Sequence, residues 1–86
     1  MRPRIAPLTD AERAFLRRYE DLHAQWLVAE EAAAKAEAAI LAAVAAHQAH
    51  AGLAPSADRW DAALRLRAMA EHALGHALQA VRCRPL

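Results

Sequence analysis

The 44 residues between Pro7 and Gly52 include neither glycine nor proline. Such a stretch can fold as one long helix, because glycine and proline are the residues that most often interrupt helices. Thr9 and Glu12 have the spacing of a capping box, in which each side chain accepts a hydrogen bond from the other residue's backbone at the start of a helix. We therefore expect a long helix that begins at Thr9 and ends at Gly52, its left-handed C-cap.

A second helix is expected after a short turn. Pro55 opposes continuation of the first helix, and Ser56 can cap the next one. The composition supports an all-α chain, since 26 of its 86 residues are alanine, the strongest helix former. The predicted parts of this single helical domain are an arm over 1–8, the first helix over about 9–51, a turn over about 52–56, a second helix over about 57–83 and a tail over 84–86.

Two long helices joined by a short turn form an antiparallel helical hairpin. The first helix carries a heptad stripe of apolar residues from Phe15 to His47, which is typical of helices that pack along their length. Beside this stripe run Leu16, Leu27, Ala34 and Leu41. On the second helix, apolar residues cover about half of the circumference. One partner helix cannot cover faces this wide, so we expect dimerisation into a four-helix bundle. A break near residues 21–25, giving a third helix, is the alternative.

The second helix is the shorter one, so residues before about 24 are expected to project beyond it. Large aromatic and apolar side chains there are suited to an interface, because such residues carry most of the binding energy between proteins. The predicted interface residues are Phe15, Tyr19, Leu22, Trp26 and Ile40. The predicted function is a helical protein–protein interaction or oligomerisation module. We expect a homodimer or a complex with another protein, in the role of a small bacterial accessory or regulatory protein.

Arginine residues gather at the end of the hairpin that is opposite the turn, which we call the open end. They are Arg2, Arg4, Arg13, Arg17, Arg18, Arg82 and Arg84. Arginine neutralises phosphate, so binding of nucleic acid through this end is the alternative function. Acidic residues share the same end and the net charge of the chain is only +1, so a solvated, salt-bridged surface explains the same pattern.

His72 and His76 are the strongest candidates for metal ligands, since they lie one helical turn apart on the second helix. Side chains at this spacing can hold one ion, but a stable site takes three or four ligands. A turn centred near residues 53–54 would bring Glu30 next to His76 and Glu37 next to His72. Polar contacts between these histidines and glutamates explain the same residues without a metal, and they are the favoured interpretation. No cofactor is predicted.

The sequence offers no arrangement of residues that is typical of catalysis. Ser56 is the only serine and is expected to cap a helix, while Cys83 has no evident base beside it. There is no glycine-rich phosphate loop. We therefore expect neither an enzyme nor a small-molecule substrate. No apolar run reaches the roughly 18 residues of a membrane span, and the N-terminal residues lack the apolar core of a secretory signal, so a cytoplasmic location is expected.

Overall fold

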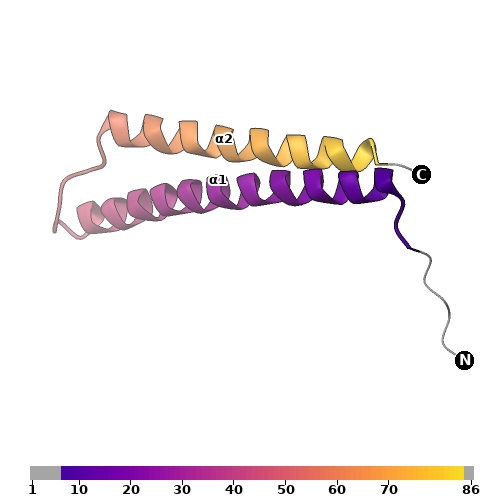
Figure 1. The fold of residues 1–86 in the computed structure, drawn as a ribbon. Helices are drawn as coiled ribbons and strands as arrows, with labels where there is room; N and C mark the ends of the chain where they lie inside the picture. Colours follow the sequence, from indigo (N-terminus) through magenta and orange to yellow (C-terminus); the bar gives the residue numbers. More distant parts are fainter. Residues whose placement is uncertain (1–6, 85–86) are drawn as a thin grey trace, which may run out of the picture.

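The computed structural model describes residues 7–84, and these residues form two α-helices and no β-strand (Figure 1). Helix α1 spans Asp10–Gln48 and helix α2 spans Ala57–Arg82. The two helices lie side by side and run in opposite directions (Figure 1). Helix α1 continues without a break through residues 21–25, so the chain does not adopt the alternative with a third helix there.

Both helices begin at the caps that the sequence predicts. In α1, Oγ1 of Thr9 accepts a hydrogen bond from the backbone N–H of Glu12, and Oε1 of Glu12 accepts one from the N–H of Thr9, both at 3.1 Å. The second bond favours the ionised carboxylate and lowers the pKa of Glu12. In α2, Oγ of Ser56 accepts a hydrogen bond from the N–H of Arg59 at 3.3 Å. These contacts confirm the capping box and the Ser56 cap.

The C-terminus of α1 differs from the expectation, because Gly52 is not its left-handed residue. His50 takes that conformation, with a φ of 56°. The N–H of Ala51 donates to the carbonyl of Ala46 at 2.8 Å, and the N–H of His50 donates to the carbonyl of His47 at 2.9 Å. This pair of bonds defines a Schellman motif. The prediction for Gly52 was wrong because the helix ends, and the chain reverses, before that residue is reached.

The helices meet along a narrow line of small side chains, which we call the alanine seam. Six of the described residues are buried, and these are Leu22, Ala33, Ile40, Ala63, Ala70 and Ala77. All six belong to the apolar stripes that the sequence predicts. Four of them are alanine, whose small side chain permits close approach of the helices but removes little apolar surface from water. The hairpin therefore has a thin core.

Helix α2 reaches further toward the start of α1 than expected. Arg84, which follows α2, lines one shallow hollow with side chains from the beginning of α1 and the residues before it. These side chains are Leu8, Glu12, Phe15 and Leu16. The part of α1 that projects beyond the second helix is therefore shorter than the predicted one, which included all residues before about 24. The reason is the path of the connection over residues 49–56. It extends beyond the end of α1 and turns back, so that α2 begins beside the last turns of α1 (Figure 1).

Candidate protein interface

Arg67 of α2 bridges two glutamates of α1 at the edge of the alanine seam. Its Nη1 donates to Oε2 of Glu30 at 2.6 Å, and its Nε donates to Oε2 of Glu37 at 3.0 Å. Its Nη2 donates to Oε1 of Glu37, so that carboxylate is held by two parallel hydrogen bonds. Bidentate arginine–carboxylate pairs are geometrically specific. We call Glu30, Arg67 and Glu37 the ion triad.

The ion triad changes the charge properties of its members and aligns the helices. The hydrogen bonds from Arg67 hold the pKa of Glu37 below its usual range, and the bonds to both glutamates raise the pKa of Arg67. The three side chains remain 30–41% exposed, so water screens their attraction. Their main contribution is to fix the register of α2 against α1. One guanidinium reaches both carboxylates only when the turn that carries Arg67 faces the turns that carry Glu30 and Glu37.

Large apolar side chains surround the ion triad on one side of the hairpin, which we call the ion-pair side. Leu41, Trp60 and Leu64 line a hollow that also includes Glu37 and Arg67. Helical periodicity adds three leucines to the same side, because residues three or eleven positions apart lie on the same side of a helix. Leu27 precedes Glu30 by three positions, Leu16 precedes Leu27 by eleven, and Leu78 follows Arg67 by eleven. The full set is Leu16, Leu27, Leu41, Trp60, Leu64 and Leu78, each between 38 and 69% exposed.

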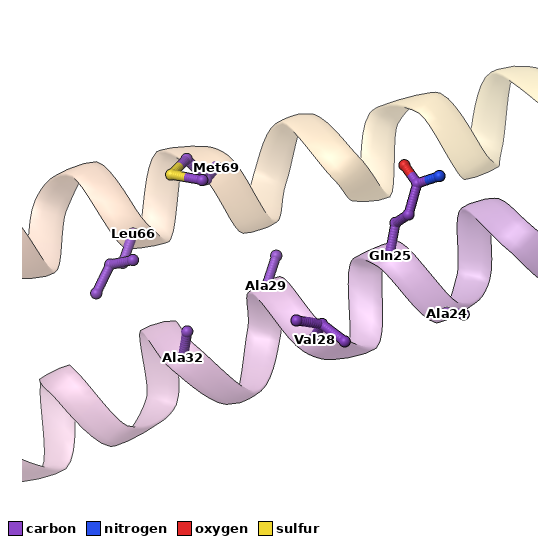
Figure 2. A pocket seen from close by; sticks show the side chains of 7 residues that line it. All are labelled: Ala24, Gln25, Val28, Ala29, Ala32, Leu66 and Met69. Carbon is purple, nitrogen blue, oxygen red and sulfur yellow. The ribbon is translucent and has the colours of Figure 1, made fainter.

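The opposite side of the hairpin, which we call the groove side, has fewer exposed large apolar residues. Its central groove is lined by Ala24, Gln25, Val28, Ala29, Ala32, Leu66 and Met69 (Figure 2). Leu66 points into the space between the helices, and Gln25 reaches from α1 toward α2 (Figure 2). Val28 and Met69 are its strongly exposed large apolar residues, so this side presents less apolar surface than the ion-pair side.

The predicted interface residues occupy two kinds of position. Leu22 and Ile40 are buried between the helices, whereas Phe15, Tyr19 and Trp26 are half-buried. The aromatic side chains form a row along α1 together with His23, and the ring centroids are 6.2, 6.0 and 5.6 Å apart in chain order. The most exposed apolar residues of the ion-pair side were not among the predicted interface residues. Their signal in the sequence is the row of leucines beside the heptad stripe.

The structure does not assemble the predicted metal ligands into one group. The exposed rings of His72 and His76 lie beside each other, with centroids 4.3 Å apart. Glu30 and Glu37 contact Arg67 instead of either histidine. Within residues 7–84, no group of three or more histidine, cysteine, aspartate or glutamate side chains is arranged to hold a metal ion.

The predicted arginine end is partly described. Arg2 and Arg4 lie outside the described residues. Arg13 forms an ion pair with Asp10 at 3.2 Å. The other arginines of this end, Arg17, Arg18, Arg82 and Arg84, are all exposed. The fold thus gathers five arginines at the open end, and a contact with nucleic acid stays a prediction.

The remaining reactive groups have structural contacts. Ser56 caps α2, and Sγ of Cys83 accepts a hydrogen bond from Nε2 of Gln79 at 3.5 Å.

In the part of the chain that the structure describes, neither helix is long and apolar enough to cross a membrane. Comparison of the chain with protein-family models, curated proteins and solved structures gives no match.

Proposed function

We propose that this chain is a non-enzymatic helical interaction module that completes its hydrophobic core by pairing with a second copy in a four-helix bundle. The observation that supports this proposal most directly is the thin core, in which four of the six buried residues are alanine. Ordering a residue costs about 1–2 kcal/mol of backbone conformational entropy, and burial of apolar surface must offset that cost. Two helices that meet mainly through alanines offset little of it.

The large apolar side chains that the core lacks are exposed on the surface of the hairpin. Ten large apolar side chains of the described residues are exposed, namely Leu8, Leu16, Leu27, Val28, Leu41, Leu53, Trp60, Leu64, Met69 and Leu78. A second hairpin would bury many of them, because two antiparallel helix pairs can pack face to face as a four-helix bundle. Symmetric dimers are also the commonest oligomers of soluble proteins.

The test is the solution mass measured by light scattering on a sizing column, from low to high micromolar protein. We expect a mass of twice 9.4 kDa. We also expect the melting temperature of the helical circular dichroism signal to rise with protein concentration, as it does when folding is linked to association. A mass of 9.4 kDa and a constant melting temperature over this range would contradict the proposal.

The same measurement at low and high salt tests whether apolar contacts or charges hold the copies together. Apolar burial persists when ionic strength rises, whereas attraction between exposed charges is screened. We therefore expect the dimer to survive at roughly 500 mM NaCl, where exposed charges are strongly screened. Dissociation at high salt would indicate that charges, rather than the exposed leucines, hold the copies together.

A further inference from the structure

We propose that the second copy docks on the ion-pair side, about a two-fold axis, so that the ion triads of the two copies meet at the centre of the interface. This inference rests on the proposed self-association and adds to it a surface and a symmetry. The groove side then remains open to solvent in the dimer.

The amount of apolar surface favours the ion-pair side. Six exposed large apolar residues lie there, against two on the groove side. From their exposed fractions, the six present on the order of 600 Å², which is at the upper end of the largest apolar patches on soluble monomers. With the intervening alanines and the methylene groups of the ion triad, this side approaches the ~800 Å² per partner of a standard protein interface.

The pattern of residues favours a second copy as the occupant. Leu16, Leu27 and Leu78 lie on the open-end part of the ion-pair side, and Leu41, Trp60 and Leu64 lie on the turn-end part. The ion triad lies between these two apolar clusters, and exposed Glu71, four residues after Arg67 on the same side of α2, adds a further charge beside it. A two-fold interface requires a surface that is complementary to itself. An order of apolar, charged and apolar meets this requirement, because a two-fold rotation through the triad places apolar clusters on apolar clusters and charges on charges.

The ion triad gives such an interface one preferred register. It combines one guanidinium with two carboxylates, and the three side chains are still partly exposed and can contact a partner. A shift of the second copy by one helical turn would place these charges against leucines, and burial of charge without a polar partner is unfavourable. Polar groups within apolar helical interfaces fix register in the same way.

Neighbouring residues on opposite sides of the hairpin provide a matched test. Leu27 and Leu64 lie on the ion-pair side, whereas Val28 and Met69 lie on the groove side and have similar or greater exposure. We expect Leu27→Glu with Leu64→Glu to raise the dimer dissociation constant by about 100-fold or more, because each dimer would bury four added charges. Val28→Glu with Met69→Glu should change it less than about threefold. Both constants come from light scattering over a dilution series.

Thiol reactivity provides a second measurement that does not depend on a disruptive change. In a Cys83→Ser background, Leu64→Cys should become protected from a soluble thiol reagent as the protein concentration rises. Met69→Cys should react at the same rate at every concentration. Concentration-dependent protection of Met69→Cys alone, in a protein that is still a dimer, would overturn this inference and leave the proposed function standing. A parent chain that stays monomeric would overturn both.

Discussion

The two sides of the hairpin share one alanine seam but present different surfaces. On the ion-pair side, leucines and Trp60 surround a charged centre formed by Glu30, Arg67 and Glu37. On the groove side, the central groove is lined by three alanines, Gln25 and Leu66, with Val28 and Met69 as the exposed large apolar residues. The difference arises from the residues that flank each heptad stripe. The heptad stripe of each helix packs at the seam between α1 and α2. The residues beside the stripes determine which side of the hairpin still has exposed apolar surface.

The largest change should come from widening the seam on which both sides depend. Ala70 is only 1% exposed, so Ala70→Leu would push the helices apart and should lower the free energy of unfolding by about 2–3 kcal/mol. Ala68→Leu is the control, because Ala68 is an exposed residue of the same helix. Urea unfolding at a fixed protein concentration measures both. Equal effects of the two substitutions would show that the seam is not closely packed.

A smaller change is expected from removal of the charge at the centre of the ion-pair side. Arg67→Met leaves Glu30 and Glu37 without their cation and should lower the melting temperature by about 5 °C. The replacements Glu30→Gln and Glu37→Gln in the same chain should restore most of the loss, because they remove the uncompensated carboxylates. Arg65→Met is the control, since Arg65 is exposed and has no ion pair among the described residues. An equally large loss of melting temperature in Arg65→Met would show that the ion triad has no special role in stability.

Acid should weaken the ion-pair side in a specific pH range. The pKa of Glu37 is lower in the folded chain than its ordinary value of 4.5, chiefly because Arg67 donates hydrogen bonds to it. The resulting stabilisation is complete above that ordinary value and is lost as the pH falls through the lower, folded pKa. Between about pH 5 and pH 3, the melting temperature of the parent chain should therefore fall more than that of Glu37→Gln. Equal falls of the melting temperature in the parent chain and in Glu37→Gln over this pH range would contradict the prediction.

The smallest effect should come from a position that belongs to neither side. His50 holds the left-handed conformation at the end of α1, which is unfavourable for a residue with a Cβ atom. His50→Gly should raise the free energy of unfolding by about 0.5–1 kcal/mol. Ala51→Gly should give no gain and serves as the control. Because both sides are unchanged in His50→Gly, thermal unfolding should shift while the dimer dissociation constant, corrected for stability, stays the same.

Features that depend on neighbouring residues could be predicted from the sequence. The capping box at Thr9 and the cap at Ser56 require only residues three apart, and both are present. The buried residues also belong to the predicted stripes, because a spacing of seven keeps side chains on one face of a helix. Such features do not depend on how one helix is placed against the other.

The register of the helices could not be predicted in the same way. The expected alignment set Glu37 next to His72, whereas Arg67 contacts both Glu37 and Glu30. The position of α2 depends on the path of the connection, and a left-handed His50 is not evident in a sequence that also offers Gly52. A useful signal was nevertheless present. Two glutamates seven residues apart and a single arginine within the apolar arc of the other helix indicate a bridging ion pair.

The placement of Leu8 and Arg84 around one hollow has a consequence for how the chain can be connected. Because these positions lie together, a short peptide could join them, and the exposed connection could be opened between Leu53 and Ala54 instead. Circular permutation succeeds at such exposed sites in chains whose ends are close. The permuted chain would make α2 first and α1 second, with the same seam and the same two sides. The order in which the helices are synthesised is thus separate from the surface that they build.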